Sequence, residues 1–329
     1  MNKLEQLCKL NGVSGFEYMS DEELFGIFKE FGLVPQKDKY GNIFAQKFSE
    51  KSDFSLLLDA HRDEIGLIVT EICENGFLKF STVGGVDINN LFCTEVTVLG
   101  KEPVYGIIGA VPPHLNKKDE ETMYIDTGIK DVGKIVSVGD PVKFKTDFIK
   151  LKNSQITSGA LDDRAGLFCA LSAARKIENA DVTVLASVRE ETGTQGIEHF
   201  LNKYDFDLAI NIDVTHGYYE GLPDYRAYPV GEGFTVCYGG ILDNRITKKI
   251  ENRLIKNGIA YNTEFEPSNP GTNAYNTVTH NIPAVMLSIP LKYMHTTCET
   301  LNIKDIKSLS KFISKFNWNT VLKESDELC

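Results

Sequence analysis

The chain has 329 residues, 42% of them hydrophobic and 25% charged, and a formal net charge of −11 at pH 7. This length allows a large core in roughly one to three domains, and the composition is ordinary for a soluble globular protein. The acidic balance argues against nucleic acid or an anionic membrane as the main partner. The N-terminus shows no secretory signal pattern, and the longest apolar runs are too short to span a bilayer.

The cysteine pattern indicates the compartment. Seven cysteines are scattered along the chain, and no two of them form a CxxC pair. An odd, dispersed set in a chain of this length favours free thiols over a disulfide framework or a cysteine-held zinc. We therefore expect a reducing, cytoplasmic location.

The first part of the chain predicts a helix followed by two strands. Residues 20–32, SDEELFGIFKEFG, place apolar side chains on one helical face, with Gly32 at the end. Ser20 and Glu23 have the spacing of a capping box. Residues 42–48 then have a strand-like pattern, and the apolar run 54–60 stops at His61.

Between residues 65 and 157 the pattern changes to short β-branched runs separated by Gly, Pro and Asp. Since no long segment with a helical period interrupts these runs, they predict a small antiparallel barrel or sandwich. We therefore assign residues 65–157 to an inserted β domain.

After residue 158, amphipathic helices alternate with continuous apolar runs, as expected for buried strands. The helices are expected at 162–179, 197–204, 243–258 and 303–322, and the strands at 181–188, 206–214 and 283–291. The fold class is therefore α/β, with a mostly parallel sheet covered by helices on both faces. Residues 1–64 and 158–329 form this discontinuous domain, and the small β-barrel-like domain is inserted into it.

Acidic and imidazole side chains lie at the ends of the predicted strands or shortly after them, where ligands bind in open α/β sheets. They are His61, Asp63, Glu190, Glu191, Asp213 and His295, with Asp162 and Asp163 at the start of the next helix. Taken singly, each has a more ordinary explanation. A lone histidine is more often a hydrogen-bonded core residue, two aspartates at a helix start are usually caps, and paired glutamates are usually solvated.

Taken together, these side chains favour a metal site. A set of imidazoles and carboxylates without thiolates suits Zn²⁺, Co²⁺ or Mn²⁺. These side chains converge from five places in the chain, two with an imidazole and three with carboxylates, and five ligands exceed what one catalytic zinc needs. Two divalent ions about 3.5–4 Å apart, sharing one carboxylate and a water, would use them all.

Five segments together resemble the dinuclear-metal glutamyl and tetrahedral aminopeptidases, a family within the co-catalytic zinc exopeptidases. The segments are DAHRDEIG, SGALDDRAG, REETGTQG, INIDVTHG and IPLKYMHTTCE. The likeness begins at GVSGFE, runs to the closing helix and includes the β insert. It implies a metallo-aminopeptidase that hydrolyses N-terminal residues from peptides.

The resemblance also implies a role for each residue. His61, Asp162, Glu191, Asp213 and His295 would be the metal ligands, with Asp162 bridging two ions and joined to Asp163 by a peptide bond that can be cis. Asp63 would orient the His61 ring. Glu190 would be the general base, which takes the proton of the shared water and passes it to the leaving amine. His216 lies in a matching segment, without an assigned role.

One departure from the family pattern concerns the substrate. The family usually has Gly-Thr-Asp-Ala where this chain has GTNA, so Asn273 replaces an acid. All five ligands are present, so we expect metal binding to be kept, whereas the preferred N-terminal residue stays open.

The resemblance further implies that the β insert assembles dimers, which can build a dodecamer with an internal chamber. Two alternatives to the aminopeptidase remain open at this stage. Some relatives have been named endoglucanases, and glycosidases also use paired carboxylates, but without a metal. A deacylase or carboxypeptidase of the same clan would keep the metals and change the substrate.

Overall fold

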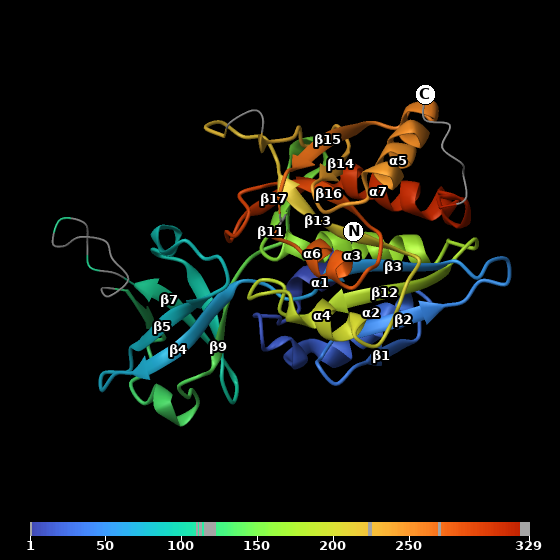
Figure 1. Cartoon of the computed structure of the whole chain (residues 1–329). Helices are drawn as coiled ribbons and strands as arrows, with labels where there is room; N and C mark the ends of the chain where they lie inside the picture. Colours follow the sequence, from blue (N-terminus) through green and yellow to red (C-terminus); the bar gives the residue numbers. More distant parts are fainter. Residues whose placement is uncertain are drawn as a thin grey trace.

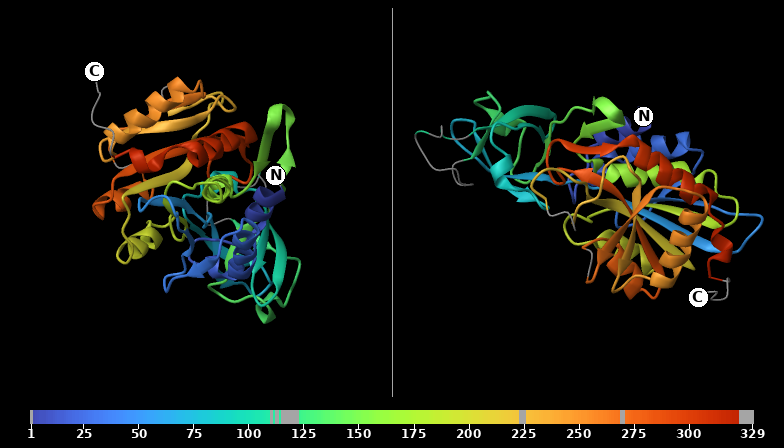
Figure 2. Two further views of the ribbon diagram at one scale, coloured as in Figure 1. Left: turned by 90° about the vertical axis from the view of Figure 1, so that its right-hand side faces the viewer. Right: turned by 90° about the horizontal axis from the view of Figure 1, so that it is seen from above.

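The computed structural model describes residues 2–109, 111, 114, 123–222, 226–268 and 271–322. Its strands form one eleven-stranded sheet and one closed six-stranded barrel. Figure 1 shows the barrel beside the larger α/β unit, and the right view of Figure 2 shows it projecting from that unit. The predicted fold class is confirmed: an α/β unit carries an inserted small β-barrel.

The large sheet is parallel in its centre, and the outer pairs along its main strand order are antiparallel. β12 pairs in parallel with β3, β3 with β13, and β13 with β16. The strand order is β1 (Pro35–Lys37), β2 (Ile43–Lys47), β12 (Asp181–Ser187), β3 (Ser55–His61), β13 (Leu208–His216), β16 (Ala284–Lys292), β17 (Glu299–Asn302), β11 (Gln155–Ser158) and β10 (Ile149–Lys150). Off this path, β14 (Phe234–Gly239) pairs with β16 and with β15 (Tyr261–Glu266).

Helices cover both faces of this sheet (Figure 2). They are α1 (Asn2–Lys9), α2 (Asp21–Glu30), α3 (Leu161–Ala174), α4 (Gln195–Leu201), α5 (Asn244–Lys256), α6 (Ala274–Thr279) and α7 (Ile303–Lys315). Successive strand residues face opposite sides of a sheet, so a central strand needs apolar residues in an unbroken run. In β3, Leu56 and Leu58 pack into the core under α3, whereas Leu57 packs with Phe200 of α4.

The helix predicted at residues 20–32 is confirmed, but its capping box is not. α2 begins at Asp21 and makes no side-chain cap hydrogen bond with Ser20. The Ser20 hydroxyl instead donates to the Asn11 carbonyl oxygen at 2.6 Å, which joins the helix start to the preceding loop. The Ser20 hydroxyl thus bonds the preceding loop and does not cap the backbone N–H groups of its own helix.

The barrel accounts for most of the inserted segment. Its strand order is β4 (Gly66–Ile72), β5 (Leu78–Val83), β8 (Tyr124–Asp126), β7 (Pro103–Gly109), β6 (Glu95–Leu99) and β9 (Pro141–Phe144). Residues such as Leu67, Val96 and Ile125 fill its own separate core. The last strands before residue 158, β10 and β11, pair in the large sheet instead.

None of the described helices is long and apolar enough to cross a bilayer. Six cysteines, at positions 8, 73, 93, 169, 237 and 298, are free thiols. The cytoplasmic location stays a prediction.

Candidate active site

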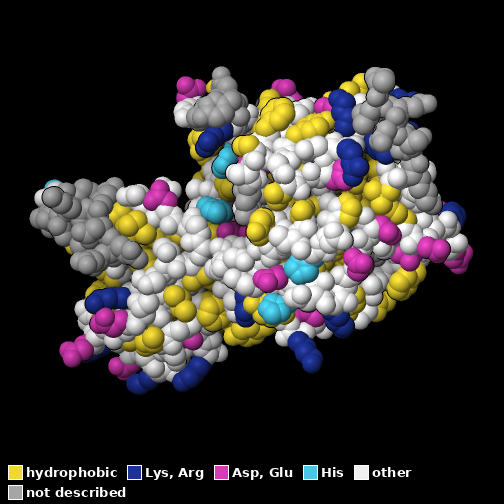
Figure 3. Space-filling view, in the orientation of Figure 1, with side chains coloured by type: hydrophobic (Ala, Val, Ile, Leu, Met, Phe, Trp, Pro, Cys, Tyr) yellow, Lys and Arg dark blue, Asp and Glu magenta, His cyan; other side chains and the backbone are white. Residues whose placement is uncertain are grey.

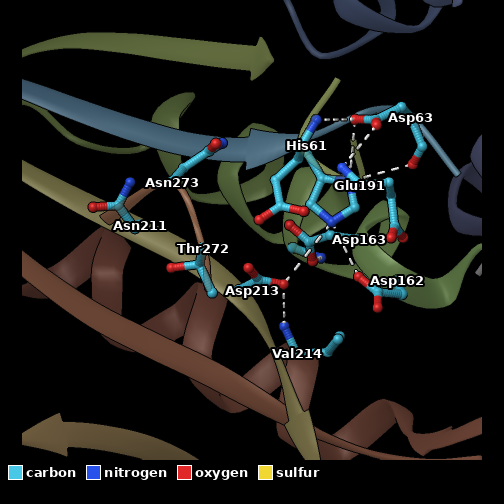
Figure 4. Close-up of polar contacts among 12 residues, drawn as sticks. His61, Asp63, Asp162, Asp163, Glu191, Asn211, Asp213, Val214, Thr272 and Asn273 are labelled. Atoms are coloured by element: carbon cyan, nitrogen blue, oxygen red, sulfur yellow. Dashed lines mark hydrogen bonds and ion pairs between the residues drawn. The ribbon is translucent and has the colours of Figure 1, made fainter. Parts of the chain in front are cut away.

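The carboxyl ends of the central strands bring the predicted residues together. His61 is the last residue of β3, Asp213 lies near the end of β13, and Glu190 follows β12. Figure 4 shows Asp63 on one side of the His61 ring, and Asp162 and Asp213 on the other. Parallel strands end at one edge of a sheet, so residues distant in sequence meet there.

Asp162, at the start of α3, lies between the two histidines. Its Oδ1 is 3.0 Å from Nε2 of His61, and its Oδ2 is 3.5 Å from Nε2 of His295. The peptide bond between Asp162 and Asp163 is cis. Because the two Asp162 oxygens lie near different imidazoles, this carboxylate has an arrangement that could bridge two ions.

Each histidine has a further carboxylate beside it. Nε2 of His295 is 3.3 Å from Oε2 of Glu191, and Nε2 of His61 is 4.0 Å from Oδ1 of Asp213. Ligand atoms of His61, Asp162 and Glu191 all lie within 4.8 Å of one another, as do those of His61, Asp163 and Asp213. These residues can hold metal.

Asp63 ties the ligand-bearing segments to each other. Its carbonyl oxygen and its Oδ1 lie 3.2 and 3.4 Å from Nδ1 of His61. Its two carboxylate oxygens also accept hydrogen bonds from the backbone N–H groups of Glu190 and Glu191, both at 3.1 Å. Asp63 is fully buried, so this arrangement fixes the orientation of the imidazole and the path of the loop after β12.

The acidic groups are too crowded to be ionised together without positive charge. Burial raises the pKa of the Asp213 carboxyl to about 7, and repulsion from Asp162 adds to the rise. Burial also raises the pKa of Glu190 and of Glu191 well above the usual range. Because buried carboxylates stay charged only beside cations or donors, two divalent ions fit this set of donors.

Two buried acids belong to the site although no role was predicted for them. Asp163 has an Oδ2 atom with no hydrogen-bond partner in the described structure, and its ligand atom groups with those of His61 and Asp213. Glu299 accepts hydrogen bonds from the backbone N–H groups of Asp162 and His295, both at 3.1 Å. Both acids lie in sequence segments that also contain a candidate metal ligand. Their closeness in sequence to Asp162 and His295 was the only sign that they belong to the site.

The inserted barrel also contributes to the site. Nδ1 of His295 lies 3.1 Å from the carbonyl oxygen of Gly85, which follows β5. A Cβ atom at position 85 would lie 2.5 Å from that nitrogen. The close approach of the backbone to the ring therefore requires glycine here.

The candidate ligands line one side of a cavity of about 340 Å³. Glu190 faces it, and its carboxylate accepts no hydrogen bond within the described part of the chain. His216 also lines the cavity. Figure 3 shows histidine side chains at the concave junction of barrel and α/β unit.

Asn273 is not among the described residues that line this cavity. Its side chain is buried, and Nδ2 donates to Oδ2 of Asp59 and to Oγ of Ser187, both at 2.8 Å. Asn211 donates to the same Asp59 carboxylate at 3.1 Å. Asn273 thus belongs to a buried hydrogen-bond network below the site.

Comparison with known proteins identifies the family. The model of the M42 glutamyl aminopeptidases matches residues 41–312. The lysyl aminopeptidase of Pyrococcus furiosus is 27% identical, over 94% of each chain. The glutamyl aminopeptidase of Lactococcus lactis is 25% identical, over 95% of this chain and 94% of that protein. The solved TET1 peptidase of Pyrococcus horikoshii is 29% identical with a TM-score of 0.83, covering 95% of this chain and 97% of that one.

A hydrolase of peptide bonds is therefore the class that the fold and the relatives define. The chain belongs to the M42 glutamyl aminopeptidase family. The predicted aminopeptidase activity is confirmed, and it is favoured over the two alternatives, a glycosidase and a deacylase or carboxypeptidase of the same clan. Members of this family are dinuclear metal-dependent peptidases, in agreement with the His, Asp and Glu groups described above.

The buried network predicts the effect of restoring an acid at position 273. In Asn273→Asp, a second carboxylate replaces the amide that now donates to Asp59. We expect the free energy of unfolding to fall by roughly 2 kcal/mol, because Asp59 then loses the donor at position 273 and faces a second buried acid, while only Asn211 and Ser187 still donate to it. Urea unfolding measures this, with Asn2→Asp, at an exposed position, as control. A shift in the preferred N-terminal residue without loss of stability would contradict it.

The contact between barrel and ligand predicts that Gly85→Ala weakens metal binding. The added Cβ would displace the His295 ring, and losses of this kind typically cost about 10–100-fold in metal affinity. Titration of the metal-free protein with Zn²⁺ measures the effect. Gly26→Ala, where a Cβ meets nothing within 4 Å, is the matched control. Unchanged zinc affinity in Gly85→Ala would show that the Gly85 contact does not position His295.

Proposed function

We propose that the protein is an aminopeptidase with a dinuclear metal centre in which Asp162 is the shared ligand. His61 and Asp213 would complete the ligands of one ion, and Glu191 and His295 those of the other. The support is the placement of the two Asp162 oxygens, 3.0 Å from one imidazole and 3.5 Å from the other. The donor types favour Zn²⁺ or Co²⁺, with Mn²⁺ as a third candidate.

When bound, such ions acidify a water and polarise the scissile carbonyl. Glu190 is our candidate for the base that takes the proton of this water and delivers it to the leaving amine. Its carboxylate faces the cavity, and burial raises its pKa well above the usual range of a glutamate. Asp63 would keep the His61 ring in place through contacts to Nδ1.

The substrates in this proposal are peptides with a free N-terminus. The cavity has carboxylates on its wall, and these attract the positive α-amine of a peptide. The names of the relatives include both lysyl and glutamyl aminopeptidases, so they leave the preferred residue open.

The barrel is our candidate for an assembly surface. Tyr105 and Ile107 lie on the same side of β7 and are 69% and 50% exposed. Exposed apolar side chains placed together often mark protein interfaces. The TET1 peptidase of Pyrococcus horikoshii assembles into a tetrahedron or a large octahedral shell. We propose that this chain forms a homo-oligomer built from dimers, up to a dodecamer.

The proposed base is tested by Glu190→Gln. The variant keeps every metal ligand but cannot accept a proton, so we expect normal metal content and a fall in kcat of about 100-fold or more. Hydrolysis of aminoacyl p-nitroanilides and metal analysis of the purified protein measure the two quantities. Near wild-type turnover would show that another group is the base.

Asp162→Ala is the contrasting variant, because it removes the oxygens shared by both sites. We expect it to lose bound metal as well as activity. In the wild-type protein, a chelator should abolish the hydrolysis, and added Zn²⁺, Co²⁺ or Mn²⁺ should restore it. Chelator-resistant peptide hydrolysis would contradict the metal centre.

The assembly surface predicts that the wild-type protein is an oligomer and that Ile107→Asp reduces its size. A charge at this exposed apolar position would be desolvated at an interface, which costs binding energy. Size-exclusion chromatography with light scattering gives the mass of each. Ile255→Asp, on α5 at a 60% exposed position, controls for the added charge. A monomeric wild-type protein would contradict the prediction.

A further inference from the structure

The wall of the cavity formed by β13, β15 and β16 carries acids that the metal centre does not use. Glu264 and Glu266 of β15 both line the cavity. Because side chains alternate along a strand, these two share one side of β15, while Phe265 between them is 68% exposed on the other. The alternation of side chains along β15 therefore places both glutamates on this wall of the cavity.

The two glutamates have different surroundings. Glu264 is buried, and its carboxylate accepts hydrogen bonds from the hydroxyl groups of Thr215 and Thr235. It is held in the wall by these donors. The Glu266 side chain is partly exposed, and no side chain in the described ranges forms an ion pair or hydrogen bond with its carboxylate. Glu266 is thus available to a ligand.

The rest of the lining suits a long side chain with a cationic end. Met286 and Met294 contribute flexible apolar surface, against which methylene groups pack well. The described lining contains no Lys or Arg, so no basic side chain there would pair with Glu266 or with an acidic substrate side chain.

We propose that Glu266 selects substrates whose N-terminal residue is Lys or Arg. The inference rests on the proposed aminopeptidase activity and adds the substrate class. The methylene stem of the substrate residue lies along Met286 and Met294, and its charged end meets the Glu266 carboxylate. An N-terminal Glu or Asp is repelled by the same wall, and an N-terminal Leu leaves the carboxylate unpaired.

The test compares kcat/KM for Lys, Arg, Leu and Glu p-nitroanilides in the metal-loaded enzyme. We expect the wild-type protein to prefer Lys and Arg. Glu266→Gln should lower the ratio of Lys to Leu by about 10- to 100-fold, mainly through KM for the basic substrates. Glu102→Gln removes the same charge from an exposed position on the barrel and should leave the ratio unchanged. Glu266→Lys should move the preference toward Glu.

The outcomes separate this inference from the activity on which it rests. A wild-type enzyme that cleaves Leu or Glu better than Lys overturns the role of Glu266 and leaves the aminopeptidase intact. A Lys-to-Leu ratio unchanged in Glu266→Gln does the same. Failure to cleave any aminoacyl substrate with saturating metal overturns both.

Discussion

The site depends on the burial of several carboxylates around two imidazoles. Bringing like charges out of water and close together is unfavourable, and the raised pKa values of Asp213, Glu190 and Glu191 express that cost. Divalent cations held by the candidate ligands would offset this cost by placing positive charge among the carboxylates. The need to place positive charge among these carboxylates also limits where Asp162 can lie. Asp162 must reach two histidines from one position, which it does from the start of α3.

A second set of carboxylates holds the backbone of the segments that carry the ligands. Asp63 accepts the N–H groups of Glu190 and Glu191, and Glu299 accepts those of Asp162 and His295. These bonds join three loops and a helix start that are far apart in sequence. The candidate ligands are therefore positioned by buried hydrogen bonds as well as by the sheet. Asp63 and Glu299 can support the site in this way without contacting a metal themselves.

Much of this arrangement was predictable because it follows from strand ends. The continuous apolar runs located β3, β12, β13 and β16, and the polar residues after them marked the edge at which ligands gather. What depends on tertiary partners was not predictable. Ser20 bonds Asn11 instead of capping its helix, and Asn273 lies below the cavity, not in its wall. Likewise, no local pattern shows that β10 and β11 join the large sheet.

The barrel is inserted directly after the first ligand-bearing strand, and this placement has a mechanical consequence. The segment that follows β5 returns to the active site, where a Cβ atom added at Gly84 would lie 3.4 Å from Cβ of Glu191, and where the Gly85 carbonyl oxygen lies 3.1 Å from Nδ1 of His295. Both neighbours are candidate ligands of the same ion. A shift of the barrel relative to the sheet would move this segment and, with it, the acceptor that orients His295. If subunits associate through the barrel, assembly and the geometry of that ion are therefore linked through this contact.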